Sequence, residues 1–367
     1  MSPGGSGNAP RPHLEGALWS GYHSPQVEVA VRLNTNEAPE PPPPEFVAAL
    51  AAAVGEVALN RYPDRRATRL REAIAELHGL GADQVFCANG SNEVIQSLLL
   101  AYGGPGRSCA LFEPTYALHS HIARLTSTRV VEGERGPDYL IEPAEVDRVL
   151  AAAAATASGD GEPAVVFLCS PNNPTGLVEP DETVEAVLAR APGIVVVDEA
   201  YIQFARRSAV ALLAGHDNLV VLRTYSKTWA LAGLRLGYAL GAPAIIEALF
   251  SAALPYHVDA VKQAAGTIAL QFTAAMDGRV ARLVAERARV LAGLAALGLA
   301  ATPSESNFIL FSTGDRDAHE VWEGLVARSV LVRDLSGWPR LAGHLRVTIG
   351  TGAENDAFLA ALADVIG

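Results

Sequence analysis

The sequence predicts an α/β fold with a mostly parallel central sheet in a large domain and a smaller α+β domain after it. Strand-like and helix-like stretches alternate from about residue 46 to residue 250, which is typical of a parallel sheet. Several strand-like stretches are continuous apolar runs, as expected for strands that are covered on both faces. After about residue 255 the alternation gives way to a long helix followed by a mixture of strands and helices.

We therefore expect three parts in the chain. An N-terminal segment over 1–45 joins the small domain, and it ends in the stretch EPPPPE at 40–45, which cannot lie inside a helix or a central strand. The large domain covers 46–250 and the small domain covers 251–367.

The individual elements follow from apolar patterning. The predicted strands of the large domain are QVFCANG (84–90), CALFEP (109–114), AVVFLCSP (164–171), IVVVDEAY (194–201), LVVLRTYS (219–226) and RLGYALG (235–241). Helices lie between them, for example over 68–79 and 91–103. In the small domain, apolar residues at helical spacing predict a long helix over about 276–297. Two strands follow at 306–311 and 345–350, with two more helices at about 317–328 and 354–365.

Composition excludes several classes of protein. No apolar run reaches the roughly 20 residues that span a bilayer, and the first residues lack the apolar core of a secretory signal, so we expect no membrane partner. Three cysteines in apolar strand-like runs indicate reduced thiols in a cytoplasmic protein. None has a histidine at metal-site spacing, so no metal is expected.

The charge of the chain argues against a nucleic-acid partner. The net charge is −12, and the 28 lysines and arginines are scattered, whereas binding to a phosphate backbone needs a concentrated basic face. A small anionic ligand remains compatible, because two or three well-placed cations suffice for it.

Polar residues stand at the ends of four apolar strands, where ligands bind in parallel sheets. Asp198 ends a fully apolar run, where an unpaired carboxylate is costly, so it needs a cationic partner. Tyr201 lies three residues further on and can reach the same place. A purely structural ion pair at Asp198 is the alternative.

The stretch VVLRTYSKTWALAGLRLGYALG over 220–241 runs from an apolar strand into two hydroxyl groups, a lysine and an arginine. Lys227 can act as a nucleophilic amine if burial and nearby cations lower its pKa. Thr224, Ser226 and Arg235 can hold a phosphate, with the guanidinium as a forked donor. A strand end followed by a solvated loop is the alternative.

Two other strand ends complete the pattern. In ANGSNE, Ser91 and Asn92 open a helix whose N-terminus can bind an anion, although N-capping by Ser91 explains the same residues. In CSPNNPTG, two prolines fix the direction of the Asn173 amide, although such a turn can also serve packing alone. A ligand with a phosphate, a protonated ring nitrogen, a phenolic oxygen and an aldehyde satisfies all four strand ends together. Pyridoxal phosphate is such a ligand.

The chain resembles the fold type I pyridoxal-phosphate-dependent aminotransferases of the aspartate aminotransferase superfamily. Within them it is most similar to the histidinol-phosphate aminotransferase subgroup. The resemblance runs from about residue 22 to the C-terminus. The motifs that carry it are VRLNTNEAPEPPP, NRYPD, ANGSNE, FEPTY, SPNNPTG, VVDEAY, YSKTWALAGLRLGY, SNFILF, LVRDLS and LRVTIGT.

The resemblance implies a role for each matching residue. Lys227 is the Schiff-base lysine and proton shuttle, Asp198 pairs with the ring nitrogen, and Tyr116 stacks on the ring. Asn173 and Tyr201 hydrogen-bond the ring hydroxyl. The phosphate is held by Ser91, Asn92, Thr224, Ser226 and Arg235, and by Tyr62 of a neighbouring subunit, which implies a homodimer with shared active sites. Tyr22, Arg333 and Arg346 hold the anionic end of the substrate.

The implied reaction is a ping-pong transamination between L-histidinol phosphate and 2-oxoglutarate, giving imidazole acetol phosphate and L-glutamate in histidine biosynthesis. The chain departs from the subgroup at Ala38, at Asn92 and at Trp229, which bears on the preferred substrate. An aromatic amino acid aminotransferase is the closest alternative, since it shares nearly every motif. A decarboxylase of an amino acid phosphate with the same fold is a further one. A transcriptional regulator would need a DNA-binding module, for which the roughly 20 residues before the match are too few.

Overall fold

The computed structural model describes residues 25–156 and 163–367. Its centre is a seven-stranded sheet in the order β2-β8-β7-β6-β5-β3-β4. The strands are β2 (Val85–Ala88), β3 (Ser108–Glu113), β4 (Arg129–Glu134), β5 (Pro163–Cys169), β6 (Ile194–Asp198), β7 (Leu219–Thr224) and β8 (Gly237–Gly241). β8 pairs antiparallel with both of its neighbours, and the remaining pairs are parallel. The prediction of a mostly parallel sheet is therefore confirmed.

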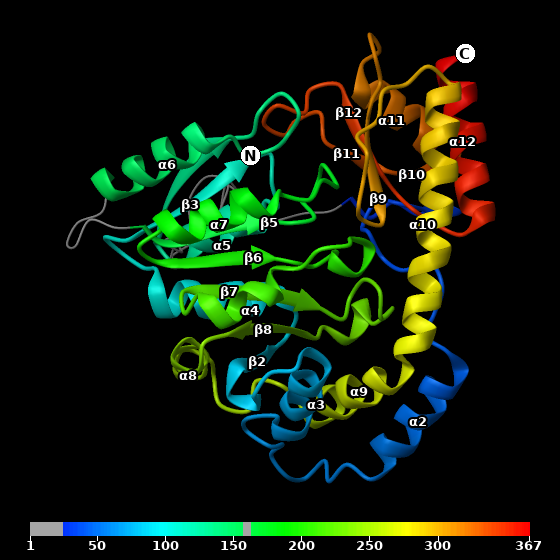
Figure 1. The fold of residues 1–367 in the computed structure, drawn as a ribbon. Coiled ribbons are helices and arrows are strands. Elements are labelled where there is room, and N and C mark those ends of the chain that lie inside the picture. Colours follow the sequence, from blue (N-terminus) through cyan, green and yellow to red (C-terminus); the bar gives the residue numbers. More distant parts are fainter. Residues whose placement is uncertain (1–24, 157–162) are drawn as a thin grey trace, which may run out of the picture.

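Helices cover both faces of this sheet (Figure 1). On β6, Val195 and Val197 belong to one core, whereas Ile194 and Val196 belong to another on the opposite face. Because successive side chains of a strand point to opposite faces, this division explains the unbroken apolar run. The first core contains residues of α2 (Pro44–Gly55), α3 (Thr68–His78), α6 (Pro143–Thr156), α7 (Asp181–Arg190) and α9 (Ala260–Ala269). The second contains residues of α4 (Ser91–Tyr102), α5 (Leu118–Leu125) and α8 (Pro243–Ala252).

A second unit lies on the side toward which β5, β6 and β7 point (Figure 1). It contains a three-stranded antiparallel sheet of order β11-β12-β9. These strands are β9 (Phe308–Ser312), β11 (Arg333–Asp334) and β12 (His344–Thr348). Its helices are α11 (Ala318–Ala327) and α12 (Gly352–Ile366), which Asp317 and Thr351 cap at their N-termini. The N-terminal segment joins this unit, because β1 (Val31–Arg32) pairs in parallel with β10 (Val330–Leu331).

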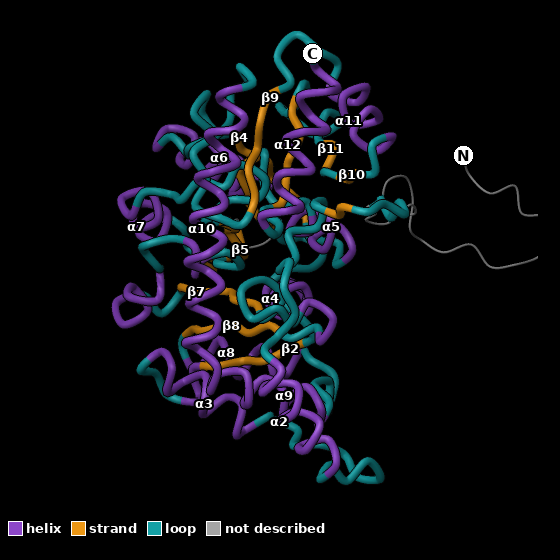
Figure 2. The backbone as a smooth tube through the Cα atoms, turned by 90° about the vertical axis from the view of Figure 1, so that its right-hand side faces the viewer, coloured by secondary structure: helices purple, strands orange, loops and turns teal. Residues whose placement is uncertain are grey.

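One long helix, α10 (Thr273–Ala296), runs past both units, and Figures 1 and 2 show it extending along one side of the molecule. Met276 near its start belongs to the first core of the large sheet, whereas Leu283 and Val290 further on belong to the core of the small unit. Since α9 packs on α2 and α3, the chain after the expected boundary at residue 250 still contributes to the large unit.

Most predicted elements lie within a few residues of the observed ones. Four strands were missed. β4 is one of them, and its residues are mostly exposed or partly exposed, so it lacks the apolar run that marks the central strands. β1, β10 and β11 are only two residues long, which is too short to show an alternating or apolar pattern. None of the helices over 25–156 and 163–367 is both long enough and apolar enough to cross a membrane.

Candidate active site

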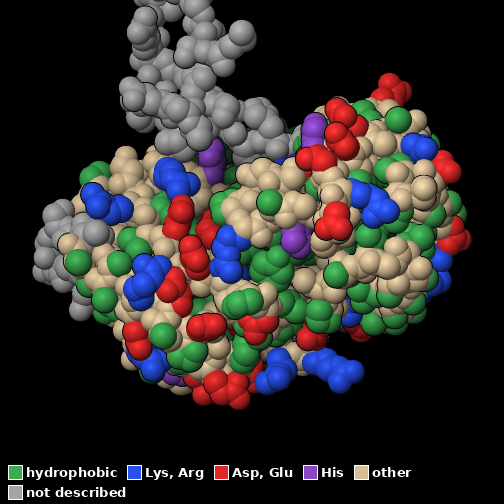
Figure 3. All heavy atoms as spheres, turned by 90° about the horizontal axis from the view of Figure 1, so that it is seen from above, with side chains coloured by type: hydrophobic (Ala, Val, Ile, Leu, Met, Phe, Trp, Pro, Cys, Tyr) green, Lys and Arg blue, Asp and Glu red, His purple; other side chains and the backbone are tan. Residues whose placement is uncertain are grey.

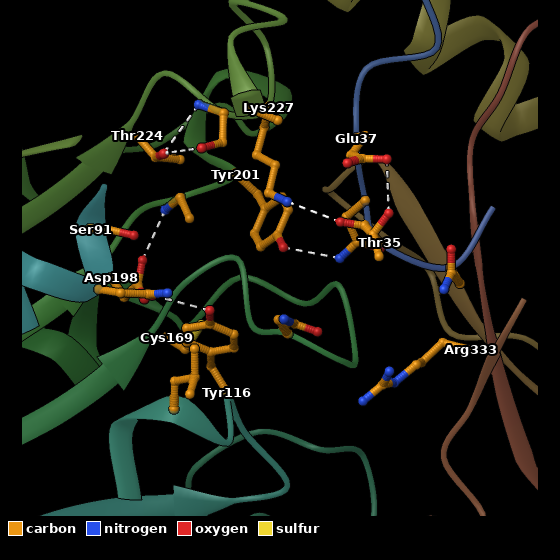
Figure 4. A pocket seen from close by; sticks show the side chains of 18 of the residues that line it. Thr35, Glu37, Ser91, Tyr116, Cys169, Asp198, Tyr201, Thr224, Lys227 and Arg333 are labelled. Carbon is orange, nitrogen blue, oxygen red and sulfur yellow. Dashed lines mark hydrogen bonds between the residues drawn. The ribbon is translucent and has the colours of Figure 1, made fainter. Parts of the chain in front are cut away.

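A cavity of about 390 Å³ lies at the carboxyl edge of the large sheet, between this sheet and the small unit. Because β2, β3, β5, β6 and β7 run in the same direction, the loops that follow them meet at this edge. Twelve of the residues predicted from the sequence line the cavity: Ser91, Asn92, Tyr116, Asn173, Asp198, Tyr201, Thr224, Ser226, Lys227, Arg235, Arg333 and Arg346. Figure 4 shows several of them pointing toward one another from different elements.

One end of the cavity is a cradle for an anion. Gly90, not Ser91, is the N-cap of α4, and no side chain caps this helix. The expected alternative role of Ser91 as an N-cap is therefore wrong: it is the first helical residue and lines the cavity. Gly90 has a φ of 81°, and a Cβ atom there would lie 2.7 Å from Nη2 of Arg235. Only glycine allows the guanidinium to approach the helix N-terminus this closely.

Hydroxyl groups complete this cradle. The Thr224 hydroxyl donates to Oγ of Ser226 at 3.0 Å, and Nη1 of Arg235 donates to the same oxygen at 3.4 Å. The guanidinium, two hydroxyls and the free N–H groups of a helix terminus thus converge on one end of the cavity, which is the donor set that a phosphate requires.

The floor of the cavity holds Asp198, which is 2% exposed. Its Oδ2 lies 3.0 Å from Nε2 of His119, and its Oδ1 accepts from the backbone N–H of Ala200 at 3.1 Å. His119 is fully buried and stacks on Phe167 at 4.6 Å. Asp198 therefore contacts an imidazole on α5, and the cationic partner predicted from the sequence stays a prediction.

The Lys227 side chain reaches the cavity from the loop after β7 and points toward the N-terminal segment (Figure 4). Its Nζ donates to the carbonyl of Thr35 at 3.1 Å. Burial of the amine, and then the positive charge of Arg346, lower the pKa of Lys227 to about 8. A lysine with this pKa is partly neutral near physiological pH, so it can act as a nucleophile or a base.

Tyr201 and Asn173 offer donors to a ligand oxygen. Burial holds the pKa of Tyr201 above its ordinary value, and its hydroxyl accepts from Nδ2 of Asn36 at 2.9 Å, so its own proton stays available. The Oδ1 of Asn173 accepts from Nη1 of Arg346 at 2.6 Å. This contact fixes the amide so that its Nδ2 is the donating side.

Two guanidinium groups enter from the small unit. Arg333 and Arg346 are paired residues of β11 and β12, and they are 7% and 6% exposed. The Nη2 of Arg346 also donates to the carbonyl of Asn34 at 2.8 Å. Buried cations on neighbouring strands give this end of the cavity a positive charge that suits an anionic substrate group.

Two predicted residues lie elsewhere. Tyr62 is 82% exposed, outside the cavity of its own chain, and its ring stacks on that of Tyr256 at 4.6 Å. Tyr22 lies outside the described residues. Tyr116, in contrast, is in the cavity, where its hydroxyl donates to Oδ1 of Asn92 at 3.2 Å.

Sequence reasoning missed the wall that the N-terminal segment forms. Asn34, Thr35, Asn36 and Glu37 line the cavity, although their stretch was noted only as a matching motif. Asn34 and Asn36, which come shortly after the apolar residues Val31 and Leu33, are the sequence signal that could have indicated it. His119 was missed as well, and its place one helical turn after Tyr116 is the corresponding signal.

Comparison with known proteins places the chain in a family. The family model described as aminotransferase class I and II matches residues 28–362. The chain is 45% identical to a histidinol-phosphate aminotransferase of Corynebacterium glutamicum, over 94% of this chain and 93% of the relative. It is 47% identical to one of Thermobifida fusca, with the same coverage of each chain.

Solved structures show the same fold. A crystal structure of a putative histidinol-phosphate aminotransferase from Erwinia carotovora atroseptica is 26% identical, with a TM-score of 0.82 over 91% of this chain and 95% of the other. A crystal structure of histidinol-phosphate aminotransferase from Sinorhizobium meliloti in complex with pyridoxal-5'-phosphate is 24% identical. Its TM-score is 0.85, over 97% of this chain and 98% of the other. From the family match and these relatives, the chain belongs to the class I and II aminotransferases.

Proposed function

We propose that the protein catalyses transamination between L-histidinol phosphate and 2-oxoglutarate in histidine biosynthesis. The observation that carries this proposal is that one cavity holds an amine of lowered pKa, a buried carboxylate and two buried guanidiniums. Relatives that are 44–47% identical over about 94% of the chain bear the name histidinol-phosphate aminotransferase, which supports this substrate over others.

The cavity fits pyridoxal 5'-phosphate. The cradle beside Gly90, which a Cβ atom would obstruct, suits the phosphate, and Ser91, Asn92, Thr224, Ser226 and Arg235 would hold it. Asp198 would face the ring nitrogen, Tyr116 the ring, and Asn173 and Tyr201 the ring oxygen. When bound, the cofactor supplies a conjugated ring that accepts the electrons released at the substrate α-carbon.

The protein's own groups bind and move protons around that carbon. The Nζ atom of Lys227, once free, is neutral above a pH of about 8 and can take a proton from the α-carbon and return it to a neighbouring atom. The carboxylate of Asp198, oriented by His119 and the N–H of Ala200, stabilises positive charge on the atom facing it. Asp198 is 2% exposed, which limits the access of water to its carboxylate.

Arg333 and Arg346 would bind the anionic end of either substrate. A guanidinium offers paired N–H donors that match both a carboxylate and a phosphate. This versatility is needed, because one amino donor carries a phosphate and the other a carboxylate at the corresponding end. Tyr22 would assist them from the N-terminal segment.

A homodimer with shared active sites is part of the proposal. Large apolar side chains are exposed beside Tyr62: Leu59 is 81% exposed and Leu254 is 79% exposed. Such clustering marks an interaction surface, and we propose that Tyr62 of a second copy bound there contributes to the cradle of the first. A surface that binds nucleic acid concentrates basic side chains, whereas the face drawn in Figure 3 mixes acidic and basic side chains.

We also propose the cytoplasm as its location, since the three cysteines are free and buried, as in a reducing compartment. The division into 1–45, 46–250 and 251–367 stays a proposal, with the N-terminal segment attached to the small domain through β1.

A single-turnover experiment tests the substrate. The cofactor-loaded enzyme is mixed separately with L-histidinol phosphate and with L-phenylalanine, and the loss of the lysine-bound cofactor spectrum is followed. We expect faster loss with L-histidinol phosphate. Faster loss with L-phenylalanine would make the protein an aromatic aminotransferase on the same scaffold. Release of carbon dioxide from an amino acid phosphate would instead indicate the decarboxylase.

A further inference from the structure

Arg279 on α10 is a buried arginine outside the cavity, and it is 5% exposed. It holds two backbone carbonyls that are far apart in the sequence. Its Nη1 donates to the carbonyl of Thr228 at 2.9 Å, and its Nη2 donates to the carbonyl of Pro41 at 2.9 Å. One guanidinium thus connects the lysine loop to the N-terminal segment, in addition to the direct hydrogen bond between Lys227 and Thr35.

These two segments are the ones that meet at the Lys227 amine. Thr228 follows Lys227 directly, in a turn that continues through Ala230 at a φ of 56°. Pro41 ends the stretch whose upstream residues form the cavity wall, including Thr35, whose carbonyl accepts from Nζ of Lys227 at 3.1 Å. The position of Nζ relative to this wall therefore depends on both segments.

The environment of Arg279 is not that of an ordinary stabilising ion pair. Among the described residues it forms no salt bridge, its Nε is buried without a hydrogen-bond partner, and burial lowers its pKa. Burying a cation without a carboxylate is costly. Its neighbour Arg282 differs, because it forms an exposed salt bridge with Glu40 at 2.6 Å.

We propose that Arg279 is a positioning residue for the reaction, which locks the loop carrying Lys227 against the N-terminal wall of the cavity. It does not line the cavity, so it acts through Thr228 and Pro41. Without this lock, the loop and the wall move independently, and Nζ loses its fixed place. The inference rests on the proposed role of Lys227 as the group that moves the proton.

The test compares Arg279→Met with Arg282→Met in the cofactor-loaded enzyme. Methionine keeps much of the length and packing of the side chain but cannot donate. The control removes an arginine one turn away that contacts the same N-terminal stretch but not the lysine loop. For Arg279→Met we expect kcat to fall about 10- to 100-fold, with little change in KM, because misplacement of a reacting group by about 1 Å can lower a rate about 100-fold.

Hydrogen–deuterium exchange provides a readout that does not depend on activity. In Arg279→Met, exchange should rise in residues 34–41 and 228–231 and stay unchanged in β9 and β12. Arg279→Lys, which keeps donors, should restore part of kcat and part of the protection. Arg282→Met should leave hydrogen–deuterium exchange in both segments at the wild-type level.

The proposal is overturned if Arg279→Met leaves exchange in both segments and kcat at wild-type levels. It is equally overturned if exchange rises across the whole chain and Arg279→Lys restores nothing, since that pattern describes a loss of stability alone. Failure of the proposed substrate would look different: exchange would still rise in both segments, while L-histidinol phosphate would be inactive with the wild type as well.

Discussion

The Nε2 atom of His119 lies 3.0 Å from Oδ2 of Asp198, and the two side chains are 0% and 3% exposed. The other ring nitrogen, Nδ1, is buried and has no partner among the described residues. In a neutral ring, one nitrogen carries a proton and the other accepts. The contact with a carboxylate places that proton on Nε2, so that His119 donates to Asp198.

This contact predicts the effect of His119→Asn. A hydrogen bond to a charged group contributes about 1.5–3 kcal/mol, so loss of the Nε2 donor should lower kcat roughly 10- to 100-fold, because only the N–H of Ala200 then orients Asp198. Steady-state kinetics with saturating cofactor measure this change. His121→Asn on the same helix, whose side chain is partly exposed, should behave as the wild type. If both variants keep the wild-type rate, His119 does not orient Asp198.

The sequence contains two lysines, Lys227 and Lys262, which makes covalent labelling decisive. Lys262 lies in the first turn of α9 and forms a salt bridge with Asp259, the N-cap of that helix. Borohydride reduction of the cofactor-loaded enzyme, followed by peptide mass spectrometry, should place the cofactor on Lys227 alone.

Lys227→Ala should carry no label. Its turnover should fall at least about 100-fold, because the amine that transfers the proton is gone. Lys262→Arg is the matched control and should keep both. A label that appears on Lys262 in the wild type, or turnover that survives in Lys227→Ala, would contradict the assignment.

The pH dependence of the rate follows from the pKa of Lys227. Burial of the amine and the charge of Arg346 lower this pKa to about 8. The amine must be neutral to accept a proton, so kcat should fall as the pH drops through about 8. Arg346→Gln removes the positive charge near the amine, which is the second cause of the lowered pKa. The amine then binds its proton more tightly, its pKa rises, and the acid limb of the kcat profile should move to higher pH.

Arg328→Gln serves as a control for this profile, because Arg328 forms an exposed salt bridge with Asp364. Profiles are measured at saturating substrate, since Arg346 is also expected to bind it. An acid limb at the same pH in all three proteins would mean that Lys227 is not the group that titrates.

Shared active sites can be tested by mixing two defective proteins. In a dimer of one Lys227→Ala and one Tyr62→Ala subunit, one of the two sites contains neither change, provided that Tyr62 serves the neighbouring cavity. Mixing after partial denaturation and refolding should therefore raise the activity well above that of either parent. Sedimentation velocity confirms that dimers have formed. Dimers without recovered activity would place Tyr62 in the cavity of its own subunit or outside any site.

The amino-acid sequence was sufficient to predict the fold class and a central set of polar residues that lie in one cavity. Asp198 ends one apolar strand, and Asn173 and Lys227 follow two others. The carboxyl ends of parallel strands must share one edge of the sheet. No tertiary information is needed for that argument, because strand direction and connection rules fix it. The resemblance then supplied roles that spacing alone could not, such as those of Arg333 and Arg346.

The surroundings of these groups are visible only in the tertiary structure. The contact of Lys227 with Thr35 spans 192 residues of sequence, and that of His119 with Asp198 spans 79. Neither has a local pattern, because such contacts arise from how whole elements pack. Arg279 is the clearest case. In the sequence it is one of several arginines on a long helix, and only packing places its guanidinium between the lysine loop and the N-terminal segment.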